Sequence, residues 1–355
     1  MRILFISPGY PPKIGGVEYV VKSVAERLVK KGHKIVVVAG EPRSQKPSEE
    51  FINDVKIVRW PTWSPSGAYH IPRRISEFEE RLLDLAKGVD VIHIHSFHAV
   101  FTVLAGLKIG KMKPDRKLVV TGHYHGGGHT AFRNVLWSFW RSKVKNLLDM
   151  ADVIHCVSQS EKRRVLKDYP ESEEKIVVIP NGVDEDVFTY KWQGQRSNYM
   201  LYAGRIEKYK KLDEAVKLSK KMNLKLTILG QGPYKEKLRK KAEKLYPNGV
   251  EFKDFLPRQR YLETLANARY AINLSNKEAY SIFIAEALAI GTPAIVSPAI
   301  EKIYRNKERS EPYSYLTPLS SIARKFGLRV LVNYDSGIKT WSQVAINYTS
   351  LLYGY

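Results

Sequence analysis

The sequence contains one cysteine, Cys156, among 355 residues, so the chain cannot form an internal disulfide. A chain without disulfides suits a reducing compartment. The first residues, MRILFISPGYPP, hold an apolar run that a turn ends before it reaches the length of a signal-peptide core. We therefore expect a cytoplasmic protein.

No hydrophobic run is long enough to predict a transmembrane helix. The best candidate, residues 279–300, carries one charge, but Gly291, Pro293 and Pro298 interrupt it. A glutamate in the middle of a helix is also costly in lipid. We predict instead a short helix over 281–290.

Acidic residues are few beside basic ones, with 36 Asp and Glu against 58 Lys and Arg and a formal net charge of +22. A lysine-rich surface of the thermophilic kind is one explanation. An anionic partner is the other: nucleic acid, an anionic membrane face or a phosphorylated substrate. Charge alone does not separate these classes.

Apolar periodicity predicts short buried strands that alternate with amphipathic helices, in two successive blocks that meet near Pro180. The expected strands are 2–7, 34–40, 89–96, 117–123, 151–158 and 175–180, then 198–204, 224–230, 250–255, 270–275 and 293–298. Helices are expected over 15–33, 132–150, 211–222, 234–245, 258–267, 281–290 and 341–355. This alternation predicts an α/β protein whose parallel sheets are covered on both faces.

Ligands of open α/β sheets bind beyond the carboxyl ends of the strands, where several candidate residues lie. Gly15 and Gly16 follow the first strand and open a helix, so their backbone suits a phosphate, although glycines also serve turn geometry alone. The dinucleotide fingerprint G-x-G-x-x-G is absent, which disfavours a nicotinamide dehydrogenase. Arg205 and Lys210 follow a later strand and suit a diphosphate, or else belong to a solvated charged loop.

Two glutamates bracket the start of the predicted helix 281–290. Its N-terminal amides favour a phosphate, and we expect Ser281 to cap it. Glu278 before the helix and Glu286 within it can then accept hydrogen bonds from hydroxyl groups of the same ligand, as in a nucleotide-sugar site. The alternative has Glu278 as a favourable N-terminal charge and Glu286 as a surface residue, but the neighbours of Glu286 are apolar.

Histidines follow two of the predicted strands, at positions 93, 95 and 98 and at positions 123, 125 and 129. The H-x-H spacing places two rings on one face of a strand, which raises the question of a metal site. No cluster of Asp or Glu accompanies them. We expect hydrogen-bonding roles for one or two of these histidines and no metal.

The stretch 132–145 mixes tryptophan and phenylalanine with arginine and lysine. This composition is typical of a helix that lies on an anionic membrane surface. Tryptophan-rich helices are also common in protein cores, and the sequence supports both interpretations equally.

Taken in order, the motifs PGYPPKIGGVE, TGHYHG, IPNGVD, YAGRIEKYKKLD, ILGQGP and EAYSIFIAE, followed by ALAIGTPAIVS, span nearly the whole chain. In this combination the sequence resembles the retaining glycosyltransferases of family 4, which have the GT-B fold. The resemblance implies two Rossmann-like domains that face each other across a cleft, with the last helix crossing back to the first domain. We place the acceptor-side domain at 1–179 with the returning helix 340–355, and the donor-binding domain at 180–339.

The resemblance also assigns roles in donor binding. Arg205 and Lys210 match the cations that neutralise the leaving diphosphate, and Glu286 matches the glutamate that holds the ribose hydroxyls. Glu278 matches the glutamate near the transferred sugar. The diphosphate cradle corresponds to the backbone of Ser281, Ile282 and Phe283.

In the first domain, Gly15 and Gly16 match the loop that reaches toward the donor, and His123 matches the active-site histidine, with His125 as a close rival. The family needs no metal or other cofactor. The sequence departs from the family at Lys211, where glycine is usual, and over 299–338, which looks shortened.

The function that these features imply is metal-independent transfer of a hexose from a UDP- or GDP-sugar to a hydroxyl acceptor, with retention of configuration. Because the net charge is +22 and the stretch 132–145 mixes aromatic and basic residues, we expect the acceptor to be lipid-linked or otherwise membrane-associated. For the same reason we expect the enzyme to associate peripherally with the cytoplasmic membrane face. A sugar-nucleotide epimerase of the same architecture is one alternative. A basic nucleic-acid-binding protein is another, and it leaves Glu278 and Glu286 unexplained.

Overall fold

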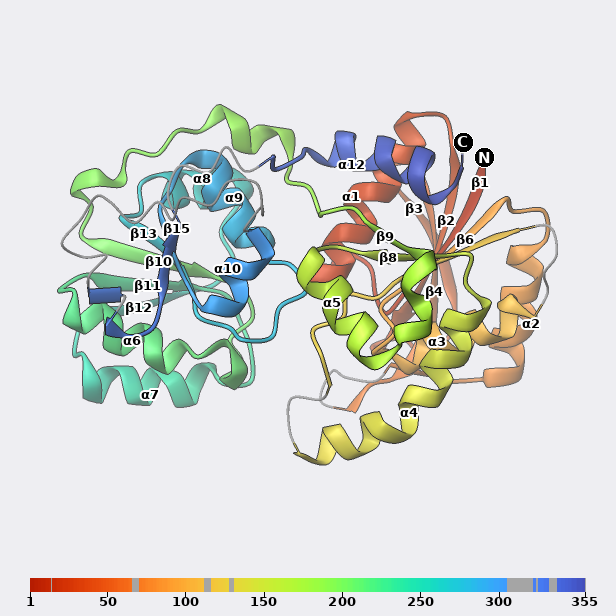
Figure 1. Cartoon of the computed structure of the whole chain (residues 1–355), viewed down its shortest axis with the longest axis horizontal. Coiled ribbons are helices and arrows are strands. Elements are labelled where there is room, and N and C mark those ends of the chain that lie inside the picture. Colours follow the sequence, from red (N-terminus) through yellow and green to blue (C-terminus); the bar gives the residue numbers. More distant parts are fainter. Residues whose placement is uncertain are drawn as a thin grey trace. The chain divides into compact units, whose positions relative to one another are not determined.

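The computed structural model describes residues 1–13, 15–65, 70–111, 116–127, 131–304, 322–323, 325–331 and 337–354, without side-chain detail for 131–136. The chain divides into two compact units (Figure 1). The first consists of Met1–Asn181 together with Trp341–Tyr355, and the second of Gly182–Thr340. Each unit is built around its own sheet.

The sheet of the first unit has the order β3-β4-β2-β1-β6-β7-β8-β9. Its strands are β1 (Arg2–Ser7), β2 (Lys34–Glu41), β3 (Ser48–Ile52), β4 (Val55–Trp63), β6 (Val91–His95), β7 (Lys117–Thr121), β8 (Val153–Cys156) and β9 (Ile176–Val178), with the short β5 (Ile71–Pro72) paired to β4. The pairs are parallel except that β3 and β5 run antiparallel to β4. Strands β3 to β5 were not predicted.

Helices of the first unit bury their apolar faces against this sheet. They are α1 (Gly16–Lys30), α2 (Ile75–Ala86), α3 (Val100–Gly110), α4 (Ala131–Met150), α5 (Gln159–Asp168) and the C-terminal α12 (Trp341–Asn347), which a π-turn continues over Tyr348–Leu352. The C-terminal helix packs on α1, where the rings of Tyr19 and Trp341 meet edge to face at 5.9 Å. Among the described residues, no helix has the length and hydrophobicity to cross a membrane.

The second unit has the strand order β12-β11-β10-β13-β14-β15. These strands are β10 (Tyr199–Ala203), β11 (Lys225–Leu229), β12 (Val250–Lys253), β13 (Tyr270–Asn273), β14 (Ala294–Val296) and β15 (Arg329–Leu331), and β15 is antiparallel to β14. The helices are α6 (Leu212–Lys221), α7 (Lys235–Leu245), α8 (Arg258–Ala266), α9 (Ile282–Ile290) and α10 (Pro298–Tyr304). One apolar cluster joins the sheet to α6 and α7, and another joins it to α8 and α9.

In each sheet the strand that comes first in the sequence lies in the interior, and later strands are added on both sides of it. β1 lies between β2 and β6, and β10 lies between β11 and β13. The carboxyl ends of such strands are the usual ligand position of doubly wound sheets. Of the divergent segment 299–338, residues 305–321, 324 and 332–336 lie outside the described residues, as does His129.

Candidate functional site

Lys210 and Glu278 form an ion pair at the carboxyl ends of β10 and β13. The Lys210 Nζ atom lies 2.5 Å from Oε1 of Glu278, and each side chain is 13% exposed. Burial by itself disfavours the charged amine, but the neighbouring Glu278 carboxylate outweighs it, so the pKa of Lys210 lies above its usual range. The next residue, Lys211, has a φ of 55°, the left-handed conformation that glycine adopts most easily. That conformation explains why glycine suits this position.

Asn273, at the end of β13, links Glu278 to the start of α9. Its Nδ2 atom donates to Oγ of Ser281 at 3.1 Å and lies 3.5 Å from Oε1 of Glu278. Ser281 does occupy the N-cap position of α9, but its hydroxyl makes no capping hydrogen bond. The predicted capping role is therefore wrong, because the hydroxyl accepts from Asn273 instead. Asn273 gave no signal in the sequence, since its role depends on the contact between strand end and helix.

The N-terminus of α9 carries amides that the helix itself does not use. The first helical hydrogen bond runs from Ala285 N to Ser281 O at 3.0 Å. The amides of Ile282 and Phe283 precede it, and the first amides of a helix have no intrahelical acceptor. Such amides, at the positive end of the helix dipole, bind anions such as phosphate.

Glu286 is 4% exposed, so its burial agrees with the apolar neighbours seen in the sequence. Arg258 Nη1 lies 2.5 Å from its Oε1, and the Tyr261 hydroxyl donates to its Oε2 at 2.5 Å. Burial raises the pKa of Glu286, and Arg258 offsets part of that rise. Each carboxylate oxygen can accept a second hydrogen bond, so capacity for two ligand hydroxyls remains. Arg258 and Tyr261 were not foreseen, because no local pattern marks a side chain that meets its partner through packing of α8 on α9.

Arg205 follows β10 but takes no part in the Lys210 ion pair. Its side chain is 54% exposed, and its Nη2 atom lies 2.8 Å from Oε1 of Glu207. The second unit thus brings Lys210 and Glu278 together and holds Arg205 in a separate, exposed pair. An exposed guanidinium of this kind is available to a phosphate at the cost of one surface ion pair.

Gly15 and Gly16 lie in the first unit, at the start of α1. Gly15 has extended backbone, and a Cβ atom there would come within 2.2 Å of the Glu18 carboxylate. Glu18 is buried and pairs with Lys13 at 3.1 Å. A side chain at position 15 would therefore displace the Glu18 carboxylate, so the close approach of that carboxylate, and not a strained turn, favours glycine here. At Gly16 a Cβ would meet nothing within 4 Å.

His123 also lies in the first unit, just beyond β7, with a φ of 47° and 8% exposure. Its Nε2 atom lies 3.4 Å from Nδ1 of His95. Burial lowers the pKa of His123 to about 3, so the ring is neutral at physiological pH. The rival His125 stacks on His98 with ring centroids 4.4 Å apart and so has different surroundings.

Two strand histidines, His93 and His155, form a series of buried polar contacts with Thr121. His155 Nε2 donates to the Ile179 carbonyl at 2.8 Å, and its Nδ1 lies 2.9 Å from Thr121 Oγ1. Thr121 Oγ1 is 2.6 Å from Nε2 of His93, whose Nδ1 lies 2.9 Å from the Tyr353 hydroxyl. This series ties the C-terminal segment to the sheet. Within the described part of the chain, no three His, Cys, Asp or Glu side chains are grouped to hold a metal.

Glu161, which the sequence did not single out, fixes the loop that carries His123. It is fully buried, and its carboxylate accepts hydrogen bonds from the backbone amides of Tyr124 and Val157. Burial raises the pKa of Glu161 to about 7, although the two amide hydrogen bonds oppose that rise. The backbone amide of Glu161 donates to Ser158 Oγ at 3.0 Å, which caps the start of α5. Glu161 therefore connects the start of α5 to the backbone of Tyr124.

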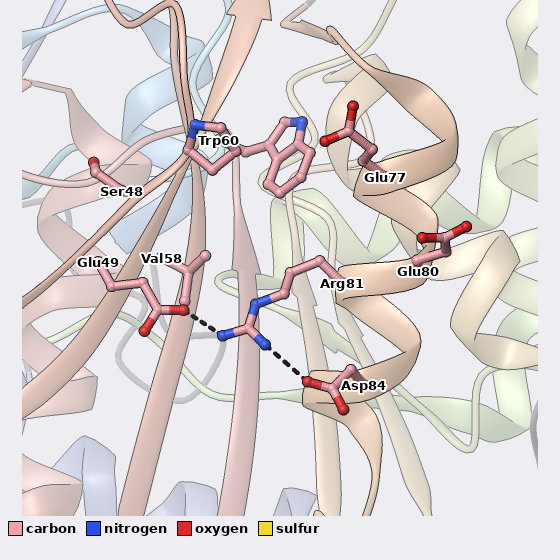
Figure 2. Close-up of a pocket in the computed structure, with 9 residues that line it drawn as sticks. Ser48, Glu49, Val58, Trp60, Glu77, Glu80, Arg81 and Asp84 are labelled. Atoms are coloured by element: carbon pink, nitrogen blue, oxygen red, sulfur yellow. Dashed lines mark hydrogen bonds and ion pairs between the residues drawn. The ribbon is translucent and has the colours of Figure 1, made fainter.

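A groove of about 600 Å³ lies in the first unit between β3, β4 and α2, and Figure 2 shows the residues that line it. Arg81 lies between Glu49 and Asp84 there and hydrogen-bonds with both. Lys56 also pairs with Glu49 at 2.7 Å, and this pairing lowers the pKa of that carboxyl. None of the predicted site residues lines the groove.

Comparisons with known proteins agree with this architecture. Residues 14–187 match the family model described as Glycosyltransferase Family 4, and residues 189–303 match Glycosyl transferases group 1. An uncharacterised glycosyltransferase of Methanocaldococcus jannaschii is 27% identical over 327 residues, which cover 84% of this chain and 80% of the relative. The GDP-mannose:cellobiosyl-diphosphopolyprenol alpha-mannosyltransferase of Xanthomonas campestris is 25% identical over 351 residues, which cover 94% of this chain and 84% of that relative.

Among solved structures, a sucrose-phosphate synthase from Thermosynechococcus elongatus superposes with a TM-score of 0.73 at 17% identity, covering 99% of this chain and 94% of that one. A sequence identity of 17% supports a conclusion about the fold alone. The predicted GT-B fold, with two α/β units, is confirmed.

Proposed function

This chain belongs to glycosyltransferase family 4, and from that premise we propose that it is a retaining, metal-independent hexosyltransferase that uses a UDP- or GDP-sugar. The observation that carries the proposal is the arrangement at the carboxyl ends of β10 and β13. The Lys210 cation, 13% exposed, and the amides at the start of α9 that have no acceptor within the helix suit a diphosphate, while Glu286 retains acceptor capacity for hydroxyl groups.

The same residues suit departure of a diphosphate. As the bond between the anomeric carbon and the diphosphate oxygen breaks, negative charge develops on that oxygen. Lys210 and the amides of Ile282 and Phe283 stabilise it, and Arg205 adds a second cation when it leaves Glu207. The acceptor oxygen then bonds to the anomeric carbon on the face that the diphosphate leaves, and the hydroxyl proton passes to the departing oxygen. Configuration is thereby retained.

The test is transfer from a panel of UDP- and GDP-sugars to lipid-linked and soluble acceptors, in EDTA, with the anomeric configuration of the product read by NMR. We expect transfer from one nucleotide class, with retention and undiminished by EDTA. A changed sugar nucleotide without an acceptor would identify an epimerase instead. Steeply salt-dependent DNA binding without nucleotide preference would favour the nucleic-acid-binding alternative.

For the acceptor we propose a membrane-associated, lipid-linked glycan or lipid, reached from an anionic membrane surface. The Xanthomonas relative is named for a diphosphopolyprenol acceptor. Phe139 on α4 is 76% exposed, and Lys143, also exposed, lies one turn further along the same helical face. An exposed aromatic ring beside a cation is the composition of an interfacial helix.

Replacing Phe139 with serine is expected to weaken binding to anionic vesicles about 10- to 100-fold, because burial of a phenylalanine side chain is worth roughly 1.5–3 kcal/mol. Sedimentation with phosphatidylglycerol vesicles at low salt measures the effect. The matched control is Phe51→Ser, since Phe51 on β3 is 73% exposed. Equal loss in both variants, or no binding by the wild type, would contradict a membrane role for α4.

A further inference from the structure

His95 is buried in the first unit beside His123. Which of the two rings donates the hydrogen bond between them depends on which nitrogen of each ring carries the proton. The His95 ring is stacked on His93 with centroids 4.1 Å apart and lies against Phe5. Its Nδ1 atom is the one that approaches His123 Nε2, at 3.4 Å. Its other nitrogen, Nε2, has no hydrogen-bond partner among the described residues.

Both rings are neutral, because burial lowers the pKa of His95 and of His123 well below the usual value. Each ring therefore carries one proton, on one nitrogen or the other. If His123 Nε2 donated to His95, the proton of His95 would sit on its Nε2, a buried N–H without an acceptor. If His95 Nδ1 donates to His123, only a lone pair on His95 Nε2 is left without a partner. Buried N–H groups without acceptors are rarer than unsatisfied acceptors, so the second arrangement is favoured.

In that arrangement the proton of His123 is on Nδ1. No hydrogen bond joins this nitrogen to another residue in the part of the chain that the structure describes. The backbone of His123 is held at a φ of 47°, and the following amide is bound by Glu161. The backbone that carries the ring is thus held in place, and one ring nitrogen is hydrogen-bonded to His95. The other nitrogen carries an N–H that can donate to a ligand.

We propose that His95 is a positioning residue, which keeps His123 in the tautomer with its proton on Nδ1 so that this N–H can donate to a hydroxyl or phosphate oxygen of a substrate. The proposal rests on the proposed function, since His123 matches the active-site histidine of the family whose reaction we propose. A neutral N–H can recognise a hydroxyl or phosphate oxygen without gaining or losing its own proton. His95 itself touches no ligand in this scheme.

Nitrogen-15 NMR of the histidine rings in the full chain tests the proposal without any assay of transfer. We expect His123 to show a protonated Nδ1 and an unprotonated Nε2. His95→Leu should abolish this preference and lower kcat/KM about tenfold, the value of one hydrogen bond. His95→Asn, whose side-chain amide can donate from about the position of Nδ1, should restore both. His155→Gln is the control, since His155 is also a buried strand histidine but does not hydrogen-bond with His123.

A protonated Nε2 on His123 in the wild type would overturn the inference, even if sugar transfer were normal. An unchanged tautomer in His95→Leu would overturn it as well, because some other group would then set the proton. If His95→Leu does not fold, the wild-type spectrum and His95→Asn decide the matter. Absence of transfer with the inferred tautomer present would instead count against the proposed function alone.

Discussion

Replacing Lys210 with methionine is expected to lower kcat for sugar transfer by about 10²–10³-fold, the usual cost of removing one group that stabilises developing charge. Lys210 is the cation, 13% exposed, that we assign to the diphosphate together with the amides of α9, and Glu278 at 2.5 Å stabilises its charge. Steady-state kinetics with the preferred donor measures the effect.

The same substitution should also destabilise the second unit. It leaves Glu278, 13% exposed, without its cation, and breaking a buried ion pair costs up to about 3–5 kcal/mol. The double variant Lys210→Met, Glu278→Gln removes the stranded charge and keeps an acceptor for Asn273. We expect it to regain most of the stability in urea unfolding but none of the activity.

Lys211→Met is the matched control, because Lys211 is the adjacent lysine and its ion pair with Glu214, at 3.6 Å, is long and lies on the surface. Its activity should stay near that of the wild type. A folded Lys210→Met enzyme with near-normal kcat would refute the assignment of Lys210 to the leaving group.

The strands and helices that form the site could be predicted because their patterns are local. The short apolar runs that become β1, β10 and β13 indicated buried strands, and the apolar neighbours of Glu286 indicated its burial. By contrast, the exposed sequence SEEFI of β3 gave no strand signal. A signal for its hairpin did exist at Asn53 and Asp54, which both have positive φ, as two-residue hairpin turns require.

The partners of the site residues could not be predicted from the sequence. Arg258 meets Glu286 across 28 positions, and His95 meets His123 across 28, through the packing of neighbouring elements. A periodic pattern tells which face of an element is buried but not which side chain of the next element lies opposite. Ser281 illustrates the limit, since its place at the N-cap was foreseen and its hydrogen bond with Asn273 was not.

Glu286→Gln is expected to weaken nucleoside diphosphate binding about 10- to 100-fold, since hydrogen bonds to a charged group are worth roughly 1.5–3 kcal/mol. Arg258 and Tyr261 each occupy one lone pair of the carboxylate and leave the others for the ribose hydroxyls. Glutamine has a single acceptor oxygen, and its amide nitrogen cannot accept from either donor. Calorimetric titration with UDP and GDP measures the loss.

The pH dependence of binding gives this prediction a second readout. Because burial raises the pKa of Glu286, its carboxylate is protonated at a higher pH than an exposed glutamate, and a protonated carboxyl is a poorer acceptor. Affinity of the wild type should therefore fall as the pH is lowered through that raised pKa, and the glutamine variant should lack this step.

Glu263→Gln on the surface of α8 is the control and should keep both affinity and pH profile. The fold should survive Glu286→Gln, because Arg258 retains Asp186 at 2.9 Å. Unaltered affinity in a folded Glu286→Gln protein would mean that the ribose is bound elsewhere.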